Sequence, residues 1–236
     1  DRWIGFLLDR VVTLDLLSNT AIVLTTDHGF YLGEHGYIGK SLLRGDAYQN
    51  LPLYPEVARI PLLIYFPGCQ GGSRIKALVQ PVDLMATVLD LLGVEKPPSV
   101  EAPSLVPLLE GRAGKVKDIA IASPSLFHDA ETPPSPADRS SITDGEWLLI
   151  YGAQPEGTAE VRTTAAVDSI VRQVKELQGE IRPELYHLAR DPKCEKNLIS
   201  EDPSVAARLH EAFLNFLSSR KYPQERLAYF RKLRSD

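Results

Sequence analysis

A short apolar run, TAIVLTT at residues 20–26, carries the first signal of the fold. Its β-branched side chains, with little polar alternation, are typical of a strand covered on both faces in a parallel sheet. Before it, Trp3, Leu7 and Val11 recur at helical spacing, so the sequence predicts a helix that leads into this strand. The order of helix, strand and glycine-bearing polar loop predicts an α/β fold.

The same alternation continues to about residue 115. Residues 59–68 predict a second buried strand, and residues 81–93 predict a helix that ends at Gly93. The long segment between the two strands, residues 29–55, is polar and without period, which predicts an irregular functional loop. We place the end of a first domain, residues 1–115, after the short helical turn expected at PSLVPLLEG.

Residues 116–236 predict a second, smaller α+β domain. Asp144-Gly145 lies between two strand-like runs, which is a hairpin signal. Residues 184–188 add a strand, and residues 203–220 predict a helix packed across the sheet. Residues 155–182 carry few large side chains and predict a mobile insertion or a marginal helix.

Polar side chains gather directly behind the first strand, in TTDHGFYLGEHGYIGK at residues 25–40. Asp27 and His28 offer a carboxylate and an imidazole, which suit calcium, magnesium, manganese or zinc, although two ligands fill none of their coordination shells. Lys40 follows across a glycine-bearing segment and can place its ammonium on an anionic oxygen. Taken alone, Asp-His-Gly is more often a capped turn than a metal site. His35 is either a hydrogen-bond partner in such a site or a solvated loop histidine.

The net charge and the hydropathy of the chain argue against two classes of partner, nucleic acids and membranes. Thirty-one acids against twenty-six bases give a net charge of −5, the wrong sign for a general nucleic-acid binder. No apolar run reaches the roughly 18 to 20 residues of a membrane span, so we expect no membrane partner. The chain opens at Asp1 inside a helical pattern, so we expect its natural start to lie upstream, and the compartment stays open.

Several segments together resemble one family. TTDHGFYLGEHGYIGK is similar to the second metal-binding segment of the sulfatases, members of the alkaline phosphatase superfamily. LYPEVARIPLLIYFPG and PVDLMATVLDLLGVEKP resemble the strand and helix that follow in that family, and ITDGEWLLIYG and ELYHLARDPKCEKNL resemble its C-terminal β subdomain. The resemblance implies an alkaline-phosphatase-like doubly wound sheet followed by a smaller antiparallel β subdomain with a C-terminal helix. Residues 1–115 would be the C-terminal part of the catalytic α/β domain.

The resemblance also implies roles for the loop residues. Asp27 and His28 would bind a divalent metal, calcium in the first place, with manganese or magnesium as alternatives. Lys40 would be catalytic and would contact the oxygens of a sulfate ester carried by a small molecule or a glycan. His35 would be a second substrate contact.

A sulfatase nucleophile is missing from these 236 residues. The family's Cys/Ser-x-Pro-x-Arg segment, whose first residue becomes formylglycine, does not occur, and neither do its N-terminal paired aspartates. We therefore expect a C-terminal portion of a sulfatase, cut inside the catalytic domain, that is inactive alone and binds metal weakly. Strand edges without partners would favour self-association.

Two other functions stay open. A phosphonate monoester or phosphodiester hydrolase of the same superfamily would use the same Asp-His pair and lysine. A non-catalytic binding or assembly module would keep the fold without the chemistry, although it has no physical need for Asp27, His28 and Lys40 in one loop.

Overall fold

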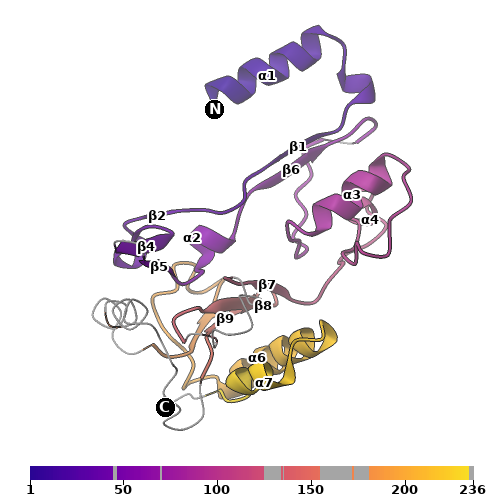
Figure 1. The fold of residues 1–236 in the computed structure, drawn as a ribbon. Coiled ribbons are helices and arrows are strands. Elements are labelled where there is room, and N and C mark those ends of the chain that lie inside the picture. The colour runs from indigo at the N-terminus through magenta and orange to yellow at the C-terminus, as the bar shows by residue number, and fades with distance from the viewer. Residues whose placement is uncertain are drawn as a thin grey trace. The chain divides into compact units, whose positions relative to one another are not determined.

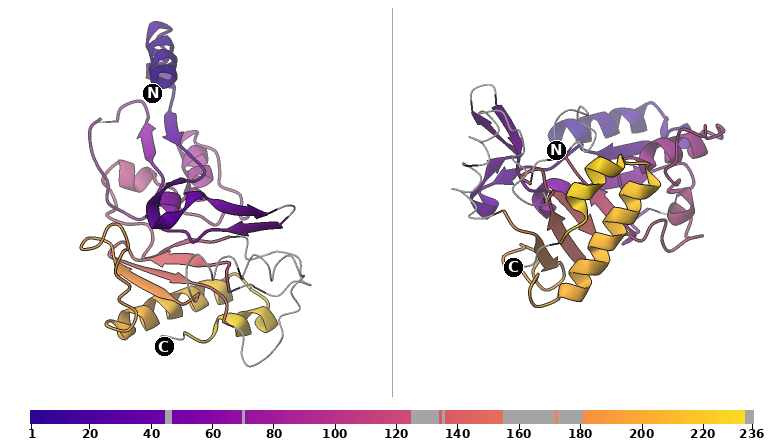
Figure 2. Two further views of the ribbon diagram at one scale, coloured as in Figure 1. Left: turned by 90° about the vertical axis from the view of Figure 1, so that its left-hand side faces the viewer. Right: turned by 60° about the horizontal axis from the view of Figure 1, so that its bottom comes forward.

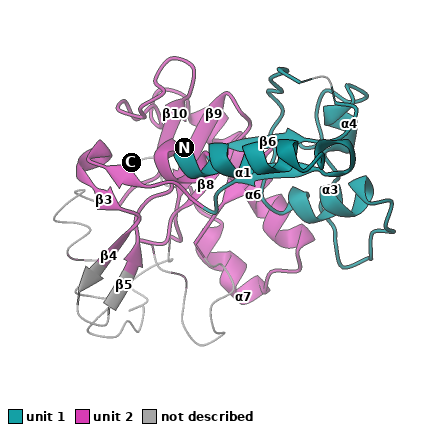
Figure 3. Cartoon of the chain, turned by 90° about the horizontal axis from the view of Figure 1, so that it is seen from above, with its two compact units in different colours: residues 1–27, 60–118 teal, residues 28–59, 119–236 magenta. Residues whose placement is uncertain are grey.

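The chain divides into two compact units in the computed structural model (Figure 3). The first comprises residues 1–27 and 60–118, and the second comprises residues 28–59 and 119–236. The structure describes residues 1–44, 47–69, 71–124, 134, 136–154, 172 and 181–233. The predicted domain division, 1–115 and 116–236, stays a prediction.

The first unit contains both helices and strands, consistent with the predicted α/β class (Figure 1). Its elements are α1 (Arg2–Thr13), the single turn η1 (Leu17–Asn19), β1 (Ile22–Thr25), β6 (Leu62–Tyr65), α3 (Asp83–Leu91) and α4 (Val106–Leu109).

Strand β1 differs from the sequence prediction in its pairing and in its burial. It pairs with β6 in antiparallel register, with Ile22 opposite Tyr65 and Thr25 opposite Leu62. Among the described residues these two strands form a sheet of their own, and most of β1 is exposed. The prediction of a strand covered on both faces in a parallel sheet is therefore wrong for β1 as described. An apolar run indicates which side chains favour burial. It does not indicate the direction of the neighbouring strand or which elements cover the run.

Helices α3 and α4 build the small core of the first unit. Thr87 donates from Oγ1 to the carbonyl of Asp83 at 2.7 Å and accepts from the backbone N–H of Leu105 at 2.9 Å. The fully buried Asp83 pairs with Lys117 at 2.7 Å, so the buried carboxylate is neutralised. Gly93, at φ 65°, follows the C-terminus of α3, where the sequence predicts the stop.

The second unit contains a four-stranded antiparallel sheet in the order β10-β9-β8-β7. Its strands are β7 (Ala120–Ala122), β8 (Ser140–Thr143), β9 (Trp147–Tyr151) and β10 (Glu184–His187). The predicted hairpin is confirmed: Asp144 accepts from the backbone N–H groups of Glu146 and Trp147 at 3.0 and 2.8 Å, and Gly145 has φ 94°.

One face of this sheet is covered by α6 (Pro203–Ser219), as the sequence predicts (Figure 2). The apolar residues of α6 pack against β8, β9 and β10 and against the segment that contains α7 (Gln224–Leu227) and η3 (Ala228–Phe230). Fully buried members of this core include Ile142, Leu149, Tyr151, Leu185, Leu209, Phe213, Leu217 and Phe230.

Residues 28–59 belong to the same unit and contain short elements that the sequence did not predict. Strand β2 (Tyr31–Leu32) pairs with β3 (Ile38–Gly39) around the turn η2 (Glu34–Gly36), and β4 (Ser41–Arg44) pairs with β5 (Ala47–Asn50) before α2 (Pro55–Ala58). The prediction of a wholly irregular loop is wrong, because two-residue and four-residue strands are too short to leave a periodic apolar pattern. Buried side chains of this segment share a core with the sheet: Tyr31, Tyr37, Leu51, Tyr54 and Val57 with Leu148, Ile150 and Tyr186.

Most of residues 155–182, predicted as an insertion or a marginal helix, lie outside the described residues. Within the described part of the chain, no helix combines the length and the apolar character needed to cross a membrane.

Candidate functional site

Asp27 lies two residues after β1, in the first unit. Its side chain is exposed, and its Oδ1 accepts from the hydroxyl of Thr26 at 3.3 Å. An exposed carboxylate after a strand can contact a cation without the cost of burying a charge.

His28 opens the second unit, and its ring is oriented by the next residue. Nδ1 lies 2.8 Å from the carbonyl oxygen of Gly29. Because a carbonyl only accepts, Nδ1 carries the proton and Nε2 carries the lone pair. A backbone carbonyl that fixes the tautomer in this way is the usual partner of a metal-binding histidine.

The backbone directly after His28 is fixed against α2. The N–H of Gly29 donates to the carbonyl of Val57 at 2.9 Å, and the N–H of Phe30 donates to the carbonyl of Glu56 at 3.1 Å. A Cβ atom added to Gly29 would lie 1.8 Å from the carbonyl oxygen of Glu56. The chain therefore needs glycine at this crossing, a reason that the sequence alone does not reveal.

The backbone around Lys40 is held by hydrogen bonds, whereas its side chain is exposed. Gly39 before it pairs with Tyr31 and has φ 92°, a conformation that favours glycine, and the carbonyl of Lys40 accepts from the N–H of Leu51 at 3.0 Å. The side chain is exposed. A fixed anchor with an exposed ammonium is suited to an anionic ligand.

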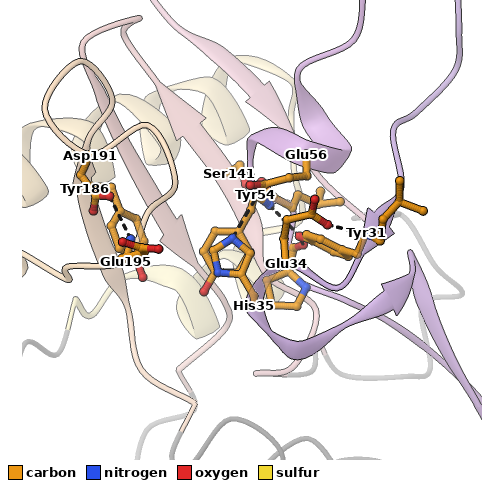
Figure 4. A network of polar contacts seen from close by, with 12 residues as sticks. Tyr31, Glu34, His35, Tyr54, Glu56, Ser141, Tyr186, Asp191 and Glu195 are labelled. Atoms are coloured by element: carbon orange, nitrogen blue, oxygen red, sulfur yellow. Dashed lines mark hydrogen bonds and ion pairs between the residues drawn. The ribbon is translucent and has the colours of Figure 1, made fainter.

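His35 is largely buried, with 15% of its side chain exposed, and it lies beside Tyr54 and Glu56 (Figure 4). Its ring stacks on that of Tyr54, with centroids 3.8 Å apart and planes 10° apart. Its Nε2 lies 3.5 Å from Oε2 of Glu56. These contacts give His35 a place in the packing of the loop, and its predicted contact with substrate stays a prediction.

A buried polar network, missed by the sequence reasoning, lies beneath His35. Glu184 accepts from the hydroxyl groups of Tyr54 and Tyr186, at 2.5 and 2.8 Å, and forms an ion pair with the buried Arg139. Burial, together with the Glu184 charge, raises the pKa of Tyr54 and that of Tyr186, so both phenols remain protonated donors.

The described residues offer a metal only part of a coordination shell. No group of three or more His, Cys, Asp or Glu side chains is placed to hold a metal within the described ranges. Asp27 and His28 fit a divalent cation by donor type, oxygen and imidazole nitrogen, but each such ion needs further ligands.

A family model described as Sulfatase matches residues 1–94, which include Asp27, His28, His35 and Lys40. Residues 1–94 belong to the sulfatase family. This sulfatase segment contains every residue that the sequence singled out for chemistry.

Similar proteins extend the sulfatase match beyond this segment. The N-acetylglucosamine-6-O-sulfatase of Bacteroides thetaiotaomicron is 40% identical over 134 residues, which cover 56% of this chain and 22% of that protein. Arylsulfatase K of Canis lupus familiaris is 32% identical over 228 residues, 95% of this chain and 35% of that protein. The chain thus spans between about a fifth and about a third of the lengths of these two relatives.

A solved structure supports the fold over nearly the whole chain. It has a TM-score of 0.67 and 24% identity, and it covers 97% of this chain and 39% of the solved chain. That protein was solved in complex with its substrate, D-glucosamine-2-N,6-O-disulfate. The likeness confirms the predicted sulfatase-type α/β fold.

Proposed function

We propose that this chain supplies part of the active site of a metal-dependent sulfatase, an enzyme that hydrolyses sulfuric esters. In this proposal Asp27 and His28 bind a divalent cation, calcium in the first place, and Lys40 binds the sulfuryl oxygens. The observation that carries the proposal is the sulfatase family match over residues 1–94, which contain all three residues.

The chemistry of each group suits this role. The metal, when bound, supplies a Lewis acid for the ester oxygen. Asp27 contributes a negative oxygen donor, and His28 contributes Nε2, because its Nδ1 proton is held by the Gly29 carbonyl. Lys40 contributes a point charge that stabilises negative charge as it develops on the ester oxygens. The exposure of Asp27 and Lys40 leaves both side chains accessible to such a ligand.

The nucleophile must come from outside these residues in this proposal. The 236 residues contain no Cys/Ser-x-Pro-x-Arg segment. The purified 236-residue chain is therefore expected to have little or no esterase activity. Robust release of p-nitrophenol from p-nitrophenyl sulfate by this chain would contradict that part of the proposal.

We propose a sulfated amino sugar as the substrate class. One relative is an N-acetylglucosamine-6-O-sulfatase, and one structural neighbour was solved with D-glucosamine-2-N,6-O-disulfate. We extend this class to the present chain because Lys40 presents an exposed cation, on a backbone held by hydrogen bonds, that suits a sulfate group.

Binding of D-glucosamine 6-sulfate tests the anion contact. We expect chemical-shift changes at the backbone amides of residues 39–41 on titration with this sugar in the presence of CaCl₂, and none with D-glucosamine. Lys40→Ala should abolish them, whereas Lys193→Ala, which removes another exposed lysine, should leave them unchanged. Equal responses to the two sugars would contradict the sulfate assignment, and an unaltered response in Lys40→Ala would contradict the role of that lysine.

A further inference from the structure

Two polar atoms face each other inside the second unit, and neither has a described hydrogen-bond partner. Nε2 of His35 and Oε2 of Glu56 are 3.5 Å apart, and the side chains are 15% and 21% exposed. Atoms of this kind, shielded from water, are costly unless they satisfy one another. The pair is therefore best explained as a polar contact between an imidazole N–H and a carboxylate oxygen, longer than an ordinary hydrogen bond.

The position of the His35 ring is constrained from two directions. Its backbone is left-handed, at φ 53°, which few side chains adopt without support from their surroundings. Its ring lies flat on Tyr54, whose N–H donates to the hydroxyl of Tyr31 at 3.1 Å and whose own hydroxyl donates to Glu184. Because Tyr54 is fixed at both ends, it gives the His35 ring a fixed plane to stack on, and Nε2 lies toward Glu56.

Glu56 holds the loop at two separate points. Its backbone carbonyl accepts from Phe30, two residues after His28, and its carboxylate contacts His35, five residues before Lys40. The loop from His28 to Lys40 contains Gly33 and Gly36, which leave the backbone freer than other residues would. The Glu56 carboxylate, together with the Tyr54 ring, thus restrains His35 in the middle of this loop.

We propose that Glu56 is a positioning residue for the loop from His28 to Lys40. Its carboxylate holds His35 on Tyr54, and this contact fixes the loop whose two ends carry the candidate metal ligand and the candidate anion-binding lysine. The catalytic meaning of this role rests on the proposed sulfatase function, but the restraint itself is a property of the chain alone.

Hydrogen exchange of the loop amides tests this role without metal or substrate. Glu56→Ala should speed exchange of amides 34–40 by at least about tenfold, because a local opening is no longer opposed by the contact. Glu56→Gln should retain most of the protection, because its amide oxygen can take the place of the carboxylate oxygen beside Nε2 of His35. Glu211→Ala, which removes an exposed glutamate on α6, is the matched control and should leave the loop unchanged.

A second variant keeps the test valid if Glu56→Ala fails to fold. His35→Asn removes the ring while asparagine still tolerates the left-handed backbone, so it should loosen amides 34–40 to a similar degree. Unchanged exchange in both variants, or equal loosening in Glu56→Gln and Glu56→Ala, would overturn the proposal. If the wild-type chain shows normal loop protection but no chemical-shift response of amides 39–41 to D-glucosamine 6-sulfate, that result would instead count against the sulfatase function.

Discussion

Gly29 shows how closely the backbone is packed beside the candidate metal ligand His28. The Glu56 carbonyl oxygen occupies the place where a Cβ would lie, 1.8 Å away, and the neighbouring backbone hydrogen bonds hold the two segments in contact. A side chain at residue 29 can be accommodated only if one backbone segment moves. Gly29 thus acts through packing, and any shift there would also move His28.

Gly29→Ala should therefore destabilise the protein. We expect a loss of about 1–3 kcal/mol in the free energy of unfolding, the usual range for overpacking against a part that cannot yield. Urea denaturation measures this change. Gly114→Ala is the control, because nothing lies within 4 Å of its added Cβ. A stability equal to that of the control would contradict the close approach.

Some residues of the candidate site could be predicted from the sequence, and others could not. Asp27, His28 and Lys40 lie within sixteen residues of one another, so their spacing is visible in a single segment. Tyr54 and Glu184 are separated by 130 residues and meet only in the folded chain. No local period encodes such a pair, which is why the buried network beneath His35 went unpredicted.

At the level of elements, long periodic segments were predicted, whereas very short strands and the pairing of strands were not. Helix α6 and the β8–β9 hairpin follow from apolar spacing and from Asp144-Gly145, because their partners lie within the same unit. Strand β1 was recognised as a strand, but its pairing and its burial were not, since both depend on neighbouring strands. The short strands between residues 31 and 50 contain too few residues to show alternation.

Helix α6 also contains a histidine that couples stability to pH. Burial lowers the pKa of His210 below its ordinary value of 6.5, an effect only partly offset by the Phe230 carbonyl, which accepts from its Nε2 at 2.7 Å. Below pH 6.5 the unfolded chain therefore binds a proton more readily than the folded chain. The contribution of His210 is present above that pH and is lost as the pH falls through the lowered folded pKa.

The free energy of unfolding of the wild type should fall between pH 7.5 and pH 5.5, and it should fall less in His210→Gln. Glutamine can still donate to the Phe230 carbonyl but does not titrate in this range. Urea denaturation at several pH values gives both slopes. Identical slopes would show that His210 is not the group responsible.

Across the whole molecule, apolar surface is distributed unevenly. The second unit buries two apolar clusters, whereas α1 in the first unit has no buried residue, with Trp3 77% and Leu7 62% exposed. Contiguous exposed apolar side chains of this size favour contact with another polypeptide. Self-association through this surface stays a prediction.

The central claim is that Asp27 and His28 of this chain bind a divalent metal. Titration of the ¹⁵N-labelled chain with MnCl₂ tests it most directly, because a paramagnetic ion broadens nearby amide resonances even when it binds weakly. We predict that amides 26–29 broaden first and that Asp27→Asn strongly reduces this effect, whereas Asp15→Asn, which alters another exposed aspartate, does not. Equal broadening in Asp27→Asn and wild type, or broadening spread over acidic surface residues without preference for amides 26–29, would contradict the claim.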